Sequence, residues 1–130
     1  MNFIKGKRLT KKEVNQILKN FYLTTHSVKQ LSNRRWEVIV WDSKGRIDLD
    51  LTKENVIEDI RKNLYIAYFD TDKSVNVAID DFNYYVFAPS LIGNKVKYWT
   101  LVTFKEPSVN GVNVFEKQKY AEINHVRKGE

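Results

Sequence analysis

The sequence contains no cysteine, and this absence excludes several kinds of site. A chain without thiols has no disulfide framework, no thiolate zinc site and no cysteine nucleophile. Histidine is nearly absent too, with only His26 and His125. General acid–base and nucleophilic catalysis usually need a positioned base, so the catalytic candidates are few. We therefore predict a protein that is not an enzyme and that occupies a reducing compartment.

Glycine and proline are scarce, with five and two residues. The glycines are far apart, so the chain lacks the clustered glycines of a phosphate-binding loop. No apolar run approaches the roughly 20 residues of a membrane-spanning helix, and the N-terminus lacks the apolar stretch of a signal peptide. These absences predict a cytoplasmic protein with no membrane partner and no cofactor.

The acidic residues do not group convincingly into a metal site. Asp48 and Asp50, and again Asp70 and Asp72, could each offer two oxygen ligands to a hard cation such as Mg²⁺. Aspartate is, however, ordinary in turns and on exposed strand faces. We predict no metal site and expect these carboxylates to pair with basic groups or to contact a basic partner.

The composition is that of a globular protein, with 42% hydrophobic and 29% charged residues over 130 positions. A chain of this length usually forms one domain with a real core. Lysine, asparagine and isoleucine are abundant while alanine is scarce. This usage is typical of AT-rich genomes, such as those of low-GC bacteria and their phages.

The first strong local pattern predicts a helix that begins after Thr10. Thr10 and Glu13 have the spacing of a capping box. The apolar residues Val14, Ile17 and Leu18, continued by Phe21, then recur on one helical face. The opposite face is polar and basic, so we expect the helix to bury one side and to offer the other.

The next segment alternates with a period of two residues. Residues 34–42 and 46–51 are predicted to form a hairpin around a turn at Asp42–Gly45, where Gly45 is free to take a positive φ. A second helix is predicted from Thr52 to Asn63, because an apolar stripe follows a capping threonine.

The remaining sequence predicts an antiparallel meander. Strands are expected at residues 65–70, 75–80, 82–88 and 95–105, followed by an edge strand at 112–115, a weak helix at 116–126 and a frayed tail at 127–130. The predicted fold is α+β: a single domain over residues 1–130, with a basic N-terminal arm at residues 1–8. We expect a twisted antiparallel sheet of about five to seven strands with two main helices packed on one face.

Charge is distributed unevenly along the chain. The first 35 residues hold nine lysines and arginines and only one acid, Glu13. Residues 36–94 hold six basic and eleven acidic residues, and residues 95–130 hold seven and four. A concentrated basic segment attracts polyanions more strongly than the same charge spread evenly. Any partner should therefore meet the end that contains the first helix.

The basic and aromatic residues define a candidate nucleic-acid or partner contact. Lysines and arginines can neutralise phosphates, and aromatic rings between them can stack on unpaired bases. Trp99 is the ring of most interest, because strand alternation places it on the same face as Lys95 and Lys97. The candidates are Lys5, Lys7, Arg8, Lys11, Lys12, Lys19, Arg34, Arg35, Lys95, Lys97 and Trp99.

Each of these features also has a purely structural interpretation. A basic helix face is often only a solvated face, and aromatic residues favour strands because strands bury them. We favour a small nucleic-acid-binding protein that uses its basic N-terminal arm and first helix. The alternative is an inhibitor from a phage or mobile element that binds a host protein or a nuclease complex. An exposed edge at residues 112–115 would also allow a homodimer.

Overall fold

The computed structural model describes residues 3–106 of the chain, and these form three α-helices, two short 3-10 helices and a five-stranded sheet. The elements are α1 (Lys11–Lys19), β1 (Phe21–Leu23), α2 (Thr25–Arg34), η1 (Trp36–Val38), α3 (Leu49–Asn63), β2 (Ile66–Phe69), η2 (Thr71–Lys73), β3 (Val75–Ala78), β4 (Tyr84–Ile92) and β5 (Lys95–Lys105). The α+β class is confirmed, with one more helix than predicted. The strand and helix predicted at 112–115 and 116–126 lie outside the described residues.

The sheet has the strand order β1-β5-β4-β3-β2. Four of its strands form the predicted antiparallel arrangement, whereas β1 runs parallel to β5, with Phe21 opposite Trp99. The sheet is therefore mixed rather than wholly antiparallel. A strand so far from its partner in sequence is not joined to it by a tight turn, so its direction is not restricted to antiparallel.

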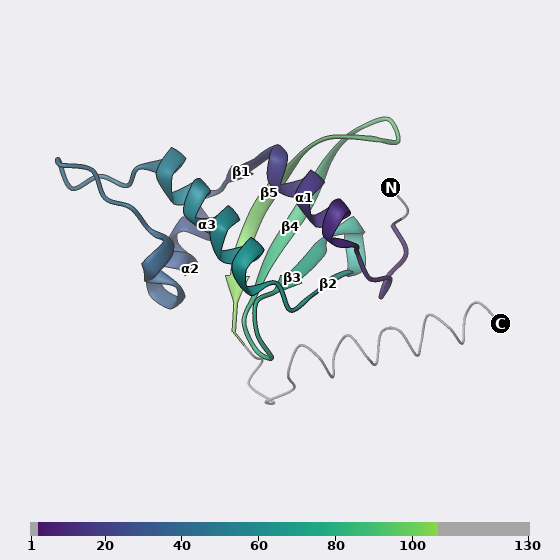
Figure 1. Ribbon diagram of the computed structural model, residues 1–130. Helices are drawn as coiled ribbons and strands as arrows, with labels where there is room; N and C mark the ends of the chain where they lie inside the picture. Colours follow the sequence, from purple (N-terminus) through teal and green to yellow (C-terminus); the bar gives the residue numbers. More distant parts are fainter. Residues whose placement is uncertain (1–2, 107–130) are drawn as a thin grey trace.

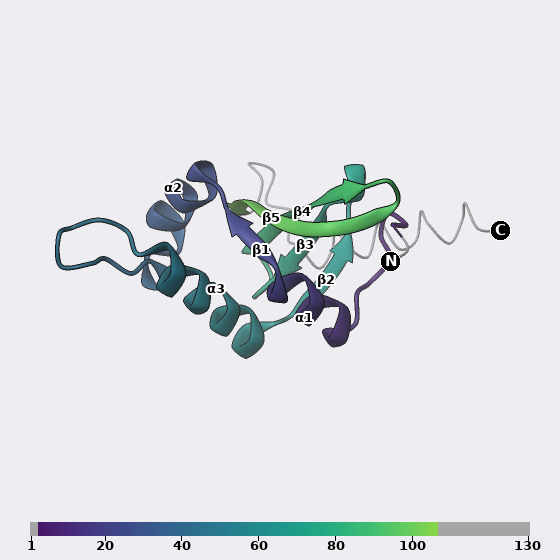
Figure 2. The same ribbon diagram turned by 90° about the horizontal axis from the view of Figure 1, so that it is seen from above.

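Helices α1 and α3 lie on one face of the sheet, and α2 packs beside β5 (Figures 1 and 2). The predicted start of α1 is confirmed: Glu13 N donates to Thr10 Oγ1 (3.2 Å), and Thr10 N donates to Glu13 Oε1 (3.0 Å). Its apolar stripe is buried against the sheet, together with residues from α2, α3 and every strand. A smaller cluster, Ile66, Tyr68, Ala78 and Tyr84, lies on the other face.

The predicted strand at residues 34–42 is wrong. Residues up to Arg34 belong to α2, which begins with a capping box between Thr24 and Ser27. This helix has a thin apolar stripe, which explains why the sequence pattern did not reveal it. After α2, Val38 at the end of η1 and the following residue, Ile39, are both buried. The alternation of buried and exposed side chains that a strand would show is therefore lost.

The predicted strand at residues 46–51 is also wrong, although its turn is present. Gly45 N donates to Asp42 O (3.1 Å), Gly45 has φ +75°, and an isolated bridge joins Trp41 to Ile47. Helix α3 then begins three residues earlier than expected, because Asp48 rather than Thr52 caps it. Leu49 and Leu51 are exposed in its first turns.

The strand predicted at residues 82–88 begins at Tyr84 and does not stop before Pro89, since β4 continues to Ile92. Past Phe87, β4 pairs with β5 and no longer with β3. Proline is tolerated in such a position, since an edge strand can lack a donor. The result is a long β4–β5 hairpin that extends beyond the rest of the sheet (Figure 1).

Candidate nucleic-acid interface

Strand β5 contains two irregularities that decide which of its side chains face solvent. Its register with β4 skips Lys97 and Val102, so each marks a β-bulge. A bulge shifts the alternation of the side chains that follow it. The core-facing residues of β5 are consequently Val96, Trp99, Leu101 and Phe104, and not the regular alternation assumed from the sequence.

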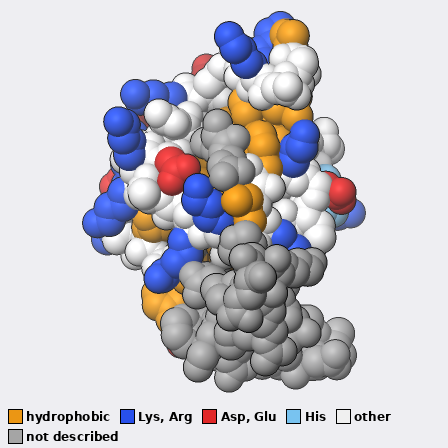
Figure 3. Space-filling model, turned by 90° about the vertical axis from the view of Figure 1, so that its right-hand side faces the viewer, with side chains coloured by type: hydrophobic (Ala, Val, Ile, Leu, Met, Phe, Trp, Pro, Cys, Tyr) orange, Lys and Arg blue, Asp and Glu red, His pale blue; other side chains and the backbone are white. Residues whose placement is uncertain are grey.

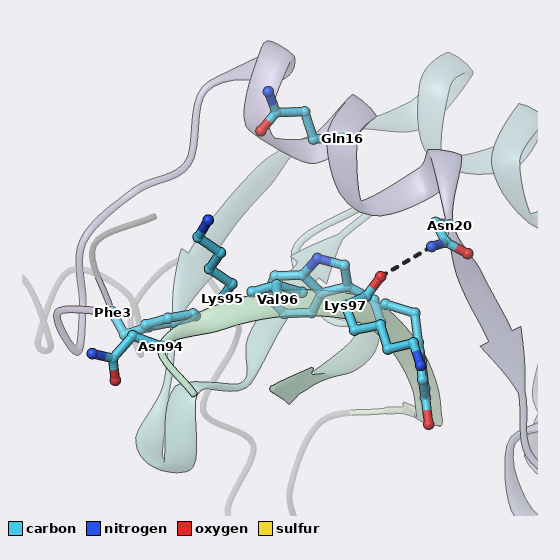
Figure 4. A pocket seen from close by; sticks show the side chains of 9 residues that line it. Phe3, Gln16, Asn20, Asn94, Lys95, Val96 and Lys97 are labelled. Carbon is cyan, nitrogen blue, oxygen red and sulfur yellow. Dashed lines mark hydrogen bonds between the residues drawn. The ribbon is translucent and has the colours of Figure 1, made fainter. Parts of the chain in front are cut away.

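A hollow of about 430 Å³ lies where the start of β5 meets α1 and the N-terminal segment (Figure 4). It combines lysines, side-chain amides and aromatic rings. Phe3 and Asn94 lie at one end of the hollow and Asn20 at the other. Its lining residues are Phe3, Gln16, Asn20, Asn94, Lys95, Val96, Lys97, Tyr98 and Trp99.

The end of α1 is tied to β5 at this hollow. Asn20, the C-cap of α1, donates from Nδ2 to Lys97 O (3.1 Å), and Trp99 N donates to Asn20 O (2.9 Å). At the other end, Gly93 has φ +61° in the β4–β5 turn, a conformation that favours glycine. Lys95 and Lys97 are exposed. The backbone that carries them is held by Asn20 at one end and by the β4–β5 turn at the other.

Trp99 does not offer its ring to a ligand in the way the sequence suggested. It is only 4% exposed and belongs to the core, because the bulge at Lys97 turns it inward. The accessible rings at this place are Tyr98 and Tyr22, which pack edge to face with centroids 5.0 Å apart. Tyr22 is 56% exposed. The predicted contact between lysines and an aromatic ring is thus available through Tyr98 rather than Trp99.

The basic N-terminal segment is held against the edge of β2. Gly6 N donates to Phe69 O (2.7 Å), Phe69 N donates to Lys7 O (2.9 Å), and Leu9 N donates to Ala67 O (2.9 Å). Arg8 forms an antiparallel bridge with Tyr68. Lys5, Lys7 and Arg8 therefore occupy fixed backbone positions along this edge, with exposed side chains.

We call residues 3–20 and 92–99 the basic end. Besides the residues above, it contains Lys11 and Lys12 in the first turn of α1 and Lys19 in its last turn, all exposed. Lysine and arginine side chains gather here around a strip of hydrophobic side chains (Figure 3). The single acid of these two ranges, Glu13, is engaged in the capping box. The concentration of positive charge predicted from the sequence is present on this surface.

Arg34 and Arg35 lie away from the basic end and are engaged elsewhere. Arg34 Nη1 donates to Phe104 O (3.1 Å), and Arg34 Nε lies 4.0 Å from Glu106 Oε1. Phe104 is seven residues along β5 from Lys97, a distance of roughly 20 Å. Since both arginines are held by internal contacts at the far end of β5, we leave them out of the candidate interface.

Arg35 belongs to a buried polar network centred on Asp59. The carboxylate accepts hydrogen bonds from Arg35 (2.6 and 3.1 Å), from Asn63 Nδ2 (2.8 Å) and from Tyr85 Oη (2.5 Å). Burial by itself would raise the pKa of Asp59, but these hydrogen bonds outweigh it and hold the pKa below its ordinary value. Burial raises the pKa of Tyr85. The network supports the fold, with Asp59 charged and Tyr85 neutral.

Metal ligands, histidines and membrane-spanning helices were the other features to look for in residues 3–106. Among residues 3–106, no three histidine, aspartate or glutamate side chains are grouped so that they could hold a metal ion. His26 is exposed on α2, and His125 lies outside the described residues. None of the helices in the described part of the chain is long and apolar enough to cross a membrane.

Comparison of the chain with protein-family models, with curated proteins and with solved structures returned no match. The candidate interface therefore depends on the geometry of the chain itself. Sequence reasoning identified its lysines but missed Phe3, Gln16, Asn20, Asn94, Tyr22 and Tyr98. Two of these residues, Asn20 and Asn94, had a local signal in the sequence, because asparagine is frequent at helix C-termini and in turns.

Proposed function

We propose that this protein binds single-stranded nucleic acid at its basic end. The observation that carries the proposal is the convergence of Lys95 and Lys97 with side-chain amides and Tyr98 around one hollow. Non-specific single-strand binding combines a basic surface that follows the backbone with aromatic rings on which bases stack. The chemistry of the hollow matches both requirements.

The arrangement of charge supports the same proposal. Lys95 and Lys97 line the hollow itself. They belong with the other lysines and arginines of the basic end, namely Lys5, Lys7, Arg8, Lys11, Lys12 and Lys19. Such groups release counterions when they neutralise phosphates, which gives affinity without reading sequence. The amides of Gln16 and Asn94 could in addition donate to a base or a phosphate.

The proposal is tested by fluorescence anisotropy with a labelled oligothymidylate of about 12 nucleotides, a length within the range of known single-strand sites. Binding should weaken steeply as the salt concentration rises. Each lost phosphate contact reduces the slope of log K against log salt by about 0.7 for a single strand. The double variant K95Q/K97Q should therefore lower the slope by about 1.4.

A charge-matched control separates this site from an effect of net charge. Lys29 and Lys44 are exposed and lie outside the basic end. The double variant K29Q/K44Q should bind the oligonucleotide like the wild type. Absence of binding at low salt, or an equal loss in both double variants, would contradict the proposal.

The alternative function, inhibition of a host protein or nuclease complex, is favoured by a different observation. Trp36 and Trp41 are 72% and 59% exposed. Exposed tryptophans are uncommon on protein surfaces and are frequent among residues that dominate protein–protein binding. If this alternative holds, a pull-down from nuclease-treated bacterial lysate should retain one stoichiometric protein with the wild type. The W36A/W41A variant should lose it.

A further inference from the structure

Two exposed tryptophans lie on the connection between α2 and α3, which we call the tryptophan loop (residues 35–48). This connection projects away from the sheet (Figures 1 and 2). Trp36 and Trp41 line one hollow of about 220 Å³ together with Ser32, Glu37 and Ile39. The alternative function proposed above gives these tryptophans a protein partner but does not say which chemical group of the partner enters this hollow. The inference below rests on that alternative and names the group.

The backbone that carries the two indoles is held firmly. Trp36 begins η1, where Ile39 N donates to Trp36 O (3.0 Å), and Trp41 is bridged to Ile47. Helix α3 supports the segment between them: Val40 N donates to Thr52 Oγ1 (3.0 Å), and Asn55 Nδ2 donates to Val38 O (3.3 Å). A ligand would therefore meet a surface whose ordering cost has largely been met on folding.

The charged side chain that lines this hollow is an acid. Its single charged lining residue is Glu37, whose carboxylate lies 3.0 Å from Arg35 Nη1. Arg35 also holds the buried Asp59 at 2.6 Å, so one guanidinium faces two carboxylates. Of these two carboxylates, Glu37 is the one that meets solvent, with its side chain 47% exposed against 8% for Asp59.

We infer that this hollow binds a cationic side chain, arginine or lysine, presented by a partner protein. Indole faces attract cations more strongly than other aromatic rings do, and arginine also stacks on them. The exposed carboxylate of Glu37 adds attraction for a cation and would repel a phosphate. Arg34 and Arg35 precede Trp36 directly in the sequence, and both are engaged: Arg34 with Phe104 O and Glu106, and Arg35 with Glu37 and Asp59.

The test uses the indole N–H signals of the full-length protein in a two-dimensional NMR titration. The chain has three tryptophans, and the buried Trp99 serves as an internal reference. N-acetyl-arginine amide should shift the signals of Trp36 and Trp41 in a saturable way. Its neutral isostere, N-acetyl-citrulline amide, should bind about 3- to 10-fold more weakly, the ratio expected for loss of a cation–π contact.

Two variants and two further probes complete the test. The E37Q variant should reduce the preference for arginine over citrulline, whereas I92A, which removes an exposed apolar side chain at the basic end, should leave it unchanged. Equal shifts with both amides, or none, would overturn the inference. So would a shift of Trp36 and Trp41 by the oligothymidylate, because nucleic acid would then be the ligand of this hollow. Saturable binding of an arginine-containing peptide, lost with its citrulline counterpart, would extend the inference to a protein partner.

Discussion

The basic end and the tryptophan loop differ in which side chains their backbones turn outward. At the basic end, the bulge at Lys97 leaves lysines outside and sends Trp99 into the core. In the tryptophan loop, η1 buries Val38 and the next residue and leaves indoles outside. Local irregularities of the backbone, more than residue type, therefore decide which aromatic rings this protein exposes to partners.

The two regions also differ in charge. The basic end holds eight cationic side chains and one acid, while the one charged side chain that lines the hollow of the tryptophan loop is the acid Glu37. Such separation orients a protein in the field of a charged partner. A polyanion should approach one region and a cationic group the other.

The largest expected effect is the difference in stability between an alanine variant of Trp99 and one of Trp36. Replacing Trp99 with alanine should lower the free energy of unfolding by about 3–5 kcal/mol, because it empties a packed core site. Replacing Trp36 should change it by no more than about 0.5 kcal/mol, because that ring is mostly in water. Urea unfolding followed by circular dichroism measures both without depending on indole fluorescence.

The matched control is Trp41→Ala, which should behave like Trp36→Ala. A loss above about 2 kcal/mol in either exposed variant would mean that the tryptophan loop packs its indoles against the domain. The comparison between the two regions would then fail, and the cation-binding inference with it.

The same contrast shows what the sequence could predict. Strong helical periodicity and a capping box correctly predicted α1, and strands were correctly predicted where β2, β3 and β5 lie. These patterns are local, so they are visible in the chain alone. The register of β5 with β4 is not local, and the bulges that turn Trp99 inward depend on it.

The tryptophan loop escaped prediction for a related reason. Its alternating residues resemble a strand, but Arg35 pairs with Asp59, and Asp48 caps α3 four residues before the expected cap Thr52. Both contacts depend on where α3 packs. The lysines of the candidate interface could be named from charge alone, whereas the hollow that joins them to Tyr98 required three separate segments to meet.

A smaller effect is expected at the anchor of the tryptophan loop. Asp59→Asn weakens hydrogen bonds to a charged partner and should cost about 2–3 kcal/mol at neutral pH. The folded-state pKa of Asp59 lies below its ordinary value of 3.8, so the carboxylate stabilises the fold above about pH 4. That stability is lost as the pH falls through the lowered pKa. Urea unfolding from pH 7 to pH 3 should therefore show the two proteins converging in acid.

The variant also separates the two regions. Oligothymidylate binding at the basic end should survive in folded Asp59→Asn, whereas arginine binding between Trp36 and Trp41 should weaken because their anchor is loosened. Equal damage to both sites would show that they are not independent. A difference in stability that stayed constant down to pH 3 would contradict the proposed role of the Asp59 carboxylate.

The smallest effect concerns β2, the strand that holds the basic N-terminal segment. Burial raises the pKa of Tyr68 to about 12 from its ordinary value of 10.0. Between pH 10 and pH 12 the unfolded chain has lost this proton while the folded chain still keeps it. The contribution of the neutral Tyr68 side chain to stability is therefore fully present below pH 10 and is lost by about pH 12. The loss in free energy of unfolding should be about 1.4 kcal/mol for each pH unit between 10 and 12.

Urea unfolding at pH 8 and pH 11 measures this loss. The free energy of unfolding of Tyr68→Phe should fall by about 1.4 kcal/mol less than that of the wild type, because phenylalanine has no proton to release. Tyr85 and the other tyrosines are common to both proteins and cancel in this difference. An identical alkaline loss in both would mean that Tyr68 already meets water, and that the edge supporting the basic end is open rather than packed.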